Sequence, residues 1–309
     1  MGSEAFRYCA SLQEVNIEEG NLTEIGDWAF DDCVKLHTIQ IPSTVERVQK
    51  YVFSSCNSLR VMQFQNGPKY LSENAFYSCK NLQSVALPES VEEIDLCAFD
   101  DCPKLVSVEL TRGSRSVTIH HQVFAECTSL VNICLPSESR LALTNSNKVS
   151  LNSFTGCSAL HNQYGSTNIP LALQQRFDNF PIHKKCYHAS GTTTGELAWE
   201  IESSMRASQE SNTNFDFLVD PFGMTPFHVL LSAAICKLDL LEVLLDAYPS
   251  NVLGWIDVNG KTAVEYLIQR SFRQSERLPN NASNGSSSMV GVFSIKLEHI
   301  GSVGIGHVE

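Results

Sequence analysis

Cysteine and histidine are the residues of this chain with the widest chemical range, and its 309 residues contain 11 and 9 of them. Thiolates and imidazoles bind zinc, paired thiols form disulfides, and an activated thiol acts as a nucleophile. Seven of the cysteines share one context, three residues after a Phe and three before a Leu: Phe6-Cys9-Leu12, Phe30-Cys33-Leu36, Phe53-Cys56-Leu59, Phe76-Cys79-Leu82, Phe99-Cys102-Leu105, Phe124-Cys127-Leu130 and Phe154-Cys157-Leu160. This regular spacing predicts a ladder of reduced, buried structural thiols rather than a disulfide or metal framework.

Two other clusters contain residue types that bind metals or nucleotides. His183, Cys186 and His188 lie within six residues, but structural zinc needs four ligands, usually as two separated pairs. The segment 254–262, Gly-Trp-Ile-Asp-Val-Asn-Gly-Lys-Thr, has five residues between its glycines, where a phosphate-binding loop has four. We therefore predict a turn at 254–262, no metal ligands and no cofactor.

Catalytic residues do not form a recognisable motif. The sequence contains no nucleophile elbow and no paired-carboxylate motif. His228, within Thr225-Pro226-Phe227-His228, is interpreted as a structural hydrogen-bonding residue rather than a base. We expect no enzymatic activity, no catalytic residues and no small-molecule substrate.

The Phe-Cys-Leu triads must be positioned by repeated elements. Successive Phe residues are 24, 23, 23, 23, 25 and 30 residues apart, and apolar and polar residues alternate after each of the first six Leu, as in the segment 82–87, Leu-Gln-Ser-Val-Ala-Leu. This period of two predicts one half-buried strand in each repeat. A second apolar pair, such as Val91 and Ile94, follows as the chain returns to the next Phe. One coil of about 23 residues cannot bury its own apolar face, so we predict an α/β repeat solenoid with a parallel sheet.

The repeat unit at 94–105, Ile-Asp-Leu-Cys-Ala-Phe-Asp-Asp-Cys-Pro-Lys-Leu, resembles the leucine-rich repeats of the BspA type. The resemblance covers about residues 4–163 and implies a curved solenoid that serves adhesion or protein recognition without catalytic activity. Insertions interrupt the period at 111–116 and 137–150, and the strand pattern ends after Leu160, which predicts a solenoid domain of seven repeats at 1–164. Because Phe6 lies in mid-repeat with no polar capping unit before it, we expect Met1 to truncate a longer array.

The residues after the solenoid show helical periodicity. Residues 171–177 predict a short helix, and Leu197, Ile201 and Met205 share one face of another, so residues 165–215 are predicted to be a helical cap or linker. The segment 220–230, Asp-Pro-Phe-Gly-Met-Thr-Pro-Phe-His-Val-Leu, resembles the opening of an ankyrin repeat, with a second helix over 240–245.

A partial copy of this ankyrin-like opening starts at Asp257, with Ala263 and Glu265 in place of the Pro and His. The ankyrin-like module is predicted at 216–273 and is expected to pack against the solenoid's end or a neighbouring chain, because two units rarely fold alone. The combination is similar to large uncharacterised families of diatom-like protists. A composition rich in Asn and Ser predicts a flexible tail at 274–309.

The charge and the apolar content of the chain indicate which partners and which cellular location to expect. A formal charge of −12 and a pI near 5.2 disfavour nucleic acid. The sequence has neither a membrane-length apolar run nor a signal peptide, so a cytoplasmic location is expected. Sequons at Asn21, Asn281 and Asn284 would matter only in a secreted protein.

Outward-facing strand residues are the candidate binding site. Residues that alternate with the inward apolar positions should lie on one continuous surface. They are Glu14, Asn16, Thr38, Gln40, Val61, Gln63, Ser84, Ala86, Ser107, Glu109, Asn132 and Cys134. We predict a non-enzymatic scaffold that binds a protein through this face. The alternative, for a truncated secreted protein, is cell-surface adhesion or carbohydrate binding.

Overall fold

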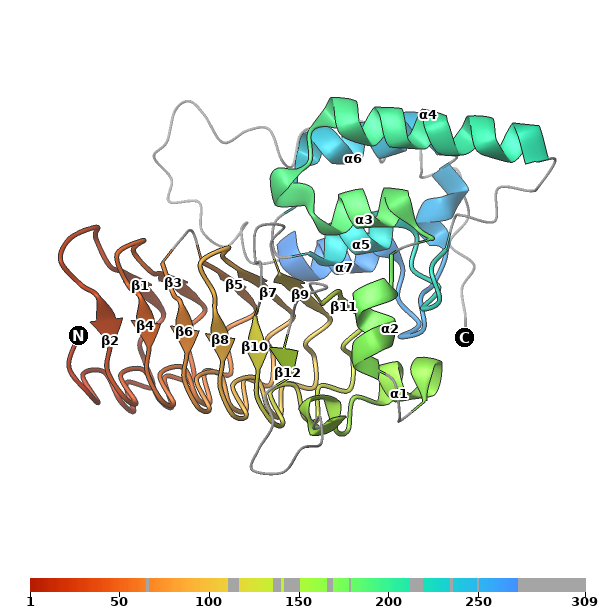
Figure 1. Cartoon of the computed structure of the whole chain (residues 1–309). Helices are drawn as coiled ribbons and strands as arrows, with labels where there is room; N and C mark the ends of the chain where they lie inside the picture. Colours follow the sequence, from red (N-terminus) through yellow and green to blue (C-terminus); the bar gives the residue numbers. More distant parts are fainter. Residues whose placement is uncertain are drawn as a thin grey trace, which may run out of the picture.

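The computed structural model describes residues 1–64, 67–110, 117–135, 140–141, 151–165, 169–177, 179–211, 219–233, 236–248 and 250–271. Figure 1 shows a solenoid that leads into helices, which cover its C-terminal end and part of one side. The insertion predicted at 111–116, most of the insertion predicted at 137–150, and the predicted tail with Asn281 and Asn284 lie outside the described residues.

Each repeat of the solenoid contributes two short parallel strands. The first row of strands is β1 (Glu14–Asn16), β3 (Thr38–Gln40), β5 (Val61–Gln63), β7 (Ser84–Leu87), β9 (Ser107–Leu110) and β11 (Asn132–Ile133). The second row is β2 (Glu24–Ile25), β4 (Arg47–Val48), β6 (Tyr70–Leu71), β8 (Glu93–Ile94), β10 (Thr118–Ile119) and β12 (Arg140–Leu141). The predicted strand is confirmed, and the returning segment, predicted only as an apolar pair, forms the second row.

The Phe-Cys-Leu triads form the interior ladder that the spacing predicts. Neighbouring Phe rings stack from Phe6 to Phe154 with centroids 5.0–5.7 Å apart. From Cys33 to Cys157, each thiol donates to the carbonyl oxygen of the preceding repeat's Phe, at 2.9–3.3 Å. Burial raises the pKa of Cys33 to about 11 and that of Cys157 to about 12. These thiols stay protonated at neutral pH and are structural.

The turns around each Phe use a backbone conformation that the sequence did not indicate. Two residues before and two residues after each of the first six Phe, the backbone is left-handed, with φ between 54° and 60°, as at Trp28 and Asp32. Such a residue costs on the order of 1 kcal/mol when it is not glycine. The cost is offset by hydrogen bonds between repeats, such as the N–H groups of Trp28, Phe30 and Asp32 to carbonyls of the next repeat, each at 2.9 Å.

The ladder ends where the repeat pattern fades. Phe154, in the 3-10 helix η1 (Leu151–Phe154), and Cys157 still stack on the preceding repeat. Leu160 is buried inside helix α1 (Ser158–Tyr164) instead of preceding a strand. Helix α2 (Ile169–Gln175) follows and overlaps the helix predicted at 171–177. The predicted end of the strand pattern is therefore confirmed.

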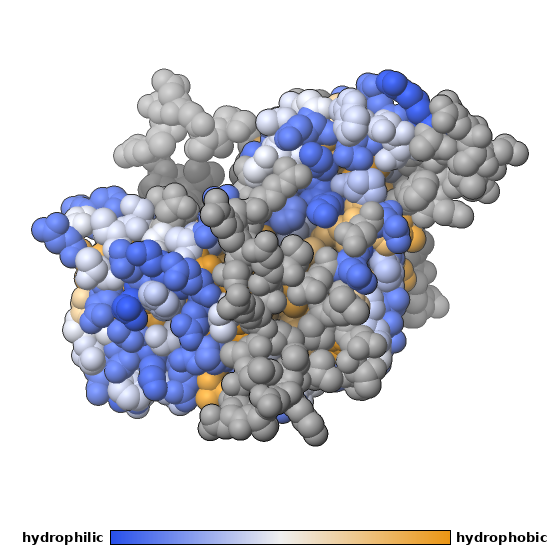
Figure 2. All heavy atoms as spheres, viewed as in Figure 1, coloured by the Kyte–Doolittle hydropathy of each residue, from blue (hydrophilic) through white to orange (hydrophobic). Residues whose placement is uncertain are grey.

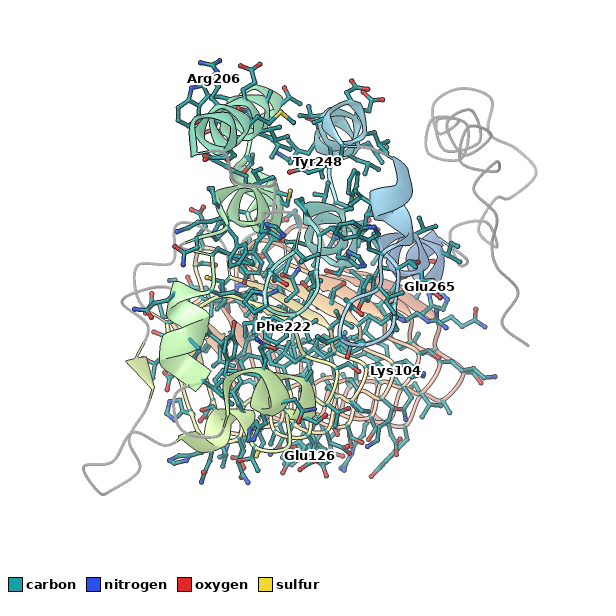
Figure 3. The ribbon with its side chains drawn as sticks, turned by 90° about the vertical axis from the view of Figure 1, so that its right-hand side faces the viewer. Lys104, Glu126, Arg206, Phe222, Tyr248 and Glu265 are labelled. Carbon is teal, nitrogen blue, oxygen red and sulfur yellow. The ribbon has the colours of Figure 1, made fainter. Side chains whose placement is uncertain are left out.

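The remaining helices form two layers. The inner layer contains α3 (Pro181–Tyr187), α5 (Pro226–Ser232) and α7 (Ala263–Ser271). The outer layer contains α4 (Thr194–Ser211) and α6 (Leu238–Ala247), and the short helices η2 (Ala189–Gly191) and η4 (Ser250–Gly254) lie in the connections. Helix α5 packs between α3 and α7, and α4 packs on α6. Viewed along the solenoid in Figure 3, the inner layer lies directly over the strands and the outer layer farther away.

Two equivalent turns introduce α5 and α7. The Asp220 carboxylate accepts the N–H groups of Phe222 and Met224 at 2.9 and 3.0 Å, and the Asp257 carboxylate accepts those of Asn259 and Lys261 at the same distances. In both turns a glycine follows the Asp by three residues, with φ of 67° and 68°. This conformation explains the shared Asp-x-x-Gly-x-Thr pattern, because glycine adopts positive φ without strain.

Each of these helices is also capped in the same way. Thr225 accepts the backbone N–H of His228, whose Nδ1 accepts the N–H of Thr225 at 3.1 Å. Thr262 and Glu265 exchange the equivalent bonds at 2.6 and 3.2 Å. His228 Nε2 lies 3.1 Å from the Lys261 carbonyl, linking the first helix to the second turn, and burial lowers the pKa of His228. The predicted structural role of His228 is confirmed.

Candidate protein-binding face

Eleven of the twelve predicted outward residues lie on paired strands of the first row, which form two sheets, β1–β3 and β5–β7–β9–β11, and Cys134 lies just beyond β11. Glu14 lies beside Thr38 and Asn16 beside Gln40. Farther along, Val61, Ser84, Ser107 and Asn132 follow one another across β5, β7, β9 and β11, and Gln63, Ala86 and Glu109 form the parallel series. The residues that the sequence placed on one face therefore occupy matching positions on neighbouring paired strands, and their role in binding stays a prediction.

Exposure divides the face into two parts. The part on β1, β3 and β5 is open, because Glu14, Asn16, Gln40 and Gln63 are exposed and Thr38 and Val61 half-buried. We call these six residues the open face. The prediction of a continuous exposed surface is wrong for β7, β9 and β11, since Ser84, Ala86, Ser107, Glu109 and Asn132 are buried, and we call these five residues the covered face. Cys134, just beyond β11, is half-buried.

The covered face is buried because the inner helices lie on it. The amide nitrogen of Asn132 lies 3.1 Å from the Ser107 hydroxyl, 3.2 Å from the Val229 carbonyl and 3.1 Å from the Ser232 hydroxyl. Val229 and Ser232 belong to α5, so a strand residue and a helix about 100 residues later are bonded directly. The helices therefore pack on the side of the solenoid as well as on its end.

Tyr187 of α3 holds the far ends of the covered strands. Its hydroxyl donates to the Val108 carbonyl at 2.6 Å and accepts the N–H groups of Leu110 and Cys134, each at 3.2 Å. Full burial raises the pKa of Tyr187. One phenol thus satisfies backbone groups of β9 and of the residue after β11, which would otherwise be unpaired beneath the helices.

A buried ion pair joins the solenoid to the first Asp turn. Arg176 and Asp220 lie 2.6 Å apart, and both side chains are 0% exposed. The guanidinium also donates to the Ile133 carbonyl at 3.3 Å and lies 4.7 and 4.8 Å from the ring centres of Phe177 and Phe222. Figure 3 places Phe222 between the helices and the solenoid. Sequence reasoning missed Arg176 and Tyr187, because neither belongs to a repeat.

Only a small hollow is seen between the described residues at the boundary of the two parts. Val61 and Ser84 on the strands face Leu231 of α5 and Tyr266 of α7 across a hollow of about 10 Å³. Such a space holds at most one water molecule.

The second row presents a different, charged surface. Ion pairs link neighbouring repeats, with Lys69 at 3.1 Å from Glu46 and Lys50 at 2.9 Å from Glu73, and His120 Nε2 lies within hydrogen-bond distance of the Glu93 carboxylate, at 2.6 Å. Figure 2 shows the N-terminal part of the solenoid as largely hydrophilic in this view. These side chains pair with one another, whereas the open face is mostly uncharged.

The described residues contain neither a metal-binding cluster nor a membrane-spanning helix. Among them, no three His, Cys, Asp or Glu side chains converge on a point where a metal ion would fit, and His183, Cys186 and His188 form no such group. All eleven cysteines are free. No helix in the described ranges has the length and apolar character that a membrane span requires.

Comparison with known proteins gives a family match for the solenoid. A model of the BspA type leucine-rich repeat region matches in six copies, over residues 1–106 and 60–180, more than half of the 309 residues. The match ends before the two Asp turns, so the resemblance of that part to ankyrin repeats stays a prediction. None of the curated proteins matches the chain.

Solved leucine-rich repeat structures also match. A T. pallidum leucine-rich repeat protein is 33% identical over 45% of this chain and 65% of its own length, with a TM-score of 0.41. A Bacteroides ovatus protein is 29% identical over 48% and 44%, with a TM-score of 0.32. A leucine-rich cell surface protein of Faecalibacterium prausnitzii is 23% identical over 51% and 60%, with a TM-score of 0.25. Each match spans less than two thirds of the protein compared.

Proposed function

The chain belongs to the BspA-type leucine-rich repeat family, and we propose that it is a non-enzymatic scaffold that binds another protein through its open face. Leucine-rich repeat proteins are in general interaction scaffolds, and solenoids commonly bind through an extended sheet surface. The cytoplasmic location expected from the sequence is part of this proposal, and the partner is a protein rather than a nucleic acid, a membrane or a small molecule.

One observation carries the proposal: the same row of strands binds protein elements along half its length. Over β7, β9 and β11 the outward side chains accept a layer of helices, and Asn132 hydrogen-bonds a helix carbonyl at 3.2 Å. Over β1, β3 and β5 the equivalent positions are exposed or half-buried. We infer that the open face binds a partner in the way that the covered face binds α5.

Affinity capture with a matched pair of variants tests the proposal. The first variant carries Asn16→Arg, Gln40→Arg and Gln63→Arg on the open face. The control carries Thr23→Arg, Gln49→Arg and Ser72→Arg, which add the same charge to the same repeats beside the second row. We expect the open-face variant to lose capture of its partner by about tenfold or more while the control retains it, because large charged side chains disrupt a mostly uncharged interface.

Two other outcomes would contradict the proposal. Equal capture by both variants would place the partner elsewhere on the molecule. Capture of glycans instead of a protein, lost in the open-face variant, would favour the adhesion alternative. Thermal unfolding of both variants checks that the substitutions leave the solenoid folded, which we expect because all six positions are exposed or half-buried.

A further inference from the structure

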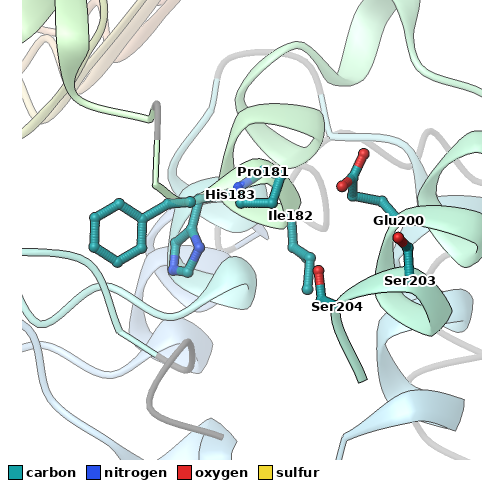
Figure 4. A pocket seen from close by; sticks show the side chains of 7 residues that line it. Pro181, Ile182, His183, Glu200, Ser203 and Ser204 are labelled. Carbon is teal, nitrogen blue, oxygen red and sulfur yellow. The ribbon is translucent and has the colours of Figure 1, made fainter. Parts of the chain in front are cut away.

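A hollow of about 280 Å³ lies between α3 and α4. Figure 4 shows Pro181, Ile182 and His183 at the start of α3 on one side and Glu200, Ser203 and Ser204 of α4 on the other. Phe180, the residue before α3, also lines the hollow. The volume is near the lower end of the range for ligand pockets. It is large enough for one long side chain and too small for a drug-sized ligand.

The α4 side of the hollow is lined by three residues with polar side chains. Glu200, Ser203 and Ser204 lie three and four residues apart, so they share one face of the helix, and all three are half-buried. Over the described residues, no Lys, Arg or His lies within ion-pair distance of Glu200. Its helix neighbours are already paired, Glu196 with Lys185 at 3.7 Å and Glu202 with Arg206 at 3.0 Å.

The α3 side combines apolar surface with one further acceptor. The Phe180 ring lies 5.4 Å from the His183 ring in an edge-on arrangement. His183 Nε2 lies 2.9 Å from the Met224 carbonyl, and because a carbonyl oxygen only accepts, Nε2 carries the proton and Nδ1 is left as an acceptor. Phe180 and Ile182 supply the apolar contact that an aliphatic stem requires.

We propose that this hollow binds an arginine or lysine side chain of a protein partner. The carboxylate of Glu200 receives the cationic head, the hydroxyls of Ser203 and Ser204 accept further hydrogen bonds, and the stem lies against Ile182 and Phe180. Arginine fits best, because its planar guanidinium presents several donors and stacks on aromatic rings. This site extends the proposed scaffold function to a second surface.

Small probes test the hollow independently of the open face. The full chain is titrated with Nα-acetyl-arginine methylamide and followed by NMR, with the uncharged norleucine analogue as a comparison. We expect a dissociation constant on the order of 1 mM for the arginine probe and binding at least about tenfold weaker for norleucine, because norleucine has no charge to pair with Glu200; a tenfold difference corresponds to about 1.4 kcal/mol. Failure of this titration would leave the open-face experiment unaffected.

Two carboxylates of α4 provide a matched control. Glu200→Gln keeps the shape of the hollow and should weaken the arginine probe about tenfold, whereas Glu202→Gln, on the exposed side of the same helix, should leave it unchanged. Equal binding by the wild type and Glu200→Gln, equal binding of norleucine, or no binding up to about 20 mM would overturn the proposal. If free arginine bound and the capped probe did not, the hollow would be a site for a free amino acid. That result would overturn the assignment to a protein side chain.

Discussion

The open and covered parts of the first row show how one repeat sequence supports two different surfaces. Both parts have the same strand register, the same Phe-Cys ladder and the same turn geometry. The covered strands carry three small outward residues, Ser84, Ala86 and Ser107, beside the larger Glu109 and Asn132, whereas Thr38, Gln40 and Gln63 lie on the open strands. Small side chains let a helix backbone approach a sheet closely. Ser84, Ala86 and Ser107 therefore leave room for the inner helices over the covered part.

The covered part also concentrates the buried polar groups of the molecule. Arg176 and Asp220 pair without any exposed surface, and Tyr187 bonds to backbone groups of β9 and of the residue after β11. On the solenoid's other row, ion pairs such as Lys50 with Glu73 remain in contact with solvent. The comparison predicts that stability depends strongly on polar groups under the helices and weakly on those outside them.

The largest expected effect comes from breaking the buried ion pair. Asp220→Asn keeps an oxygen that accepts the turn N–H groups but leaves the Arg176 charge unpaired, which should cost about 3–5 kcal/mol of unfolding free energy. Asp257→Asn is the matched control, because Asp257 holds the equivalent turn. The carboxylate oxygen of Asp257 that does not accept the turn N–H groups lies 2.5 Å from the Tyr266 hydroxyl. Urea unfolding measures both. Similar losses in the two variants would show that the turn, and not the buried charge, sets the cost.

The next effect is a loss of stability in mild acid. Burial lowers the pKa of His183 from 6.5 to about 4, so between these values the unfolded chain binds a proton that the folded chain does not. Stability is fully present above about pH 6.5 and should fall by about 3 kcal/mol as the pH drops toward 4. His183→Gln should flatten this part of the profile, measured by denaturation at several pH values. If the dependence of stability on pH were unchanged in His183→Gln, the loss of stability in acid would come from other titrating groups.

A smaller difference in stability is expected between a variant of the covered part and a variant of the open part of the first row. Asn132→Ala removes the amide that bonds Ser107 and α5, and should cost about 1–3 kcal/mol because buried partners lose their hydrogen bonds. Asn16→Ala, on the open face, should change stability by less than about 0.5 kcal/mol. Chemical denaturation compares the two. If the Asn16 variant lost as much stability as the Asn132 variant, the open face would also be covered in solution.

The smallest effect concerns the charged second row. Lys50→Ala removes a pair with Glu73 in which the Lys side chain is 51% exposed, and should cost about 0–1 kcal/mol, less in high salt. Denaturation at low and high salt measures the difference. A loss above about 2 kcal/mol would contradict the view that only the groups beneath the helices are energetically critical.

Local pattern predicted most of the fold and half of the candidate site. The alternation in segments such as 82–87 gave the first-row strands and their outward residues, and the spacing of Phe and Cys gave the ladder. The Thr-Pro pattern at 225–226 gave the start of α5. The left-handed turn residues were not predictable, because types as different as Trp28, Cys97 and Gln122 occupy them; inter-repeat hydrogen bonds, rather than residue preference, select that conformation.

The sequence by itself determined the repeat, the strand register and the identity of the residues on the first-row face, because each depends on periodicity within about 23 residues. Only the tertiary structure decided which of those residues are accessible. Contacts between Asn132 and Ser232, or between Tyr187 and Val108, join residues 100 and 79 positions apart. Such contacts depend on how two separately patterned regions pack, and no local periodicity encodes them. The location of the open face therefore follows from where the helices end on the sheet.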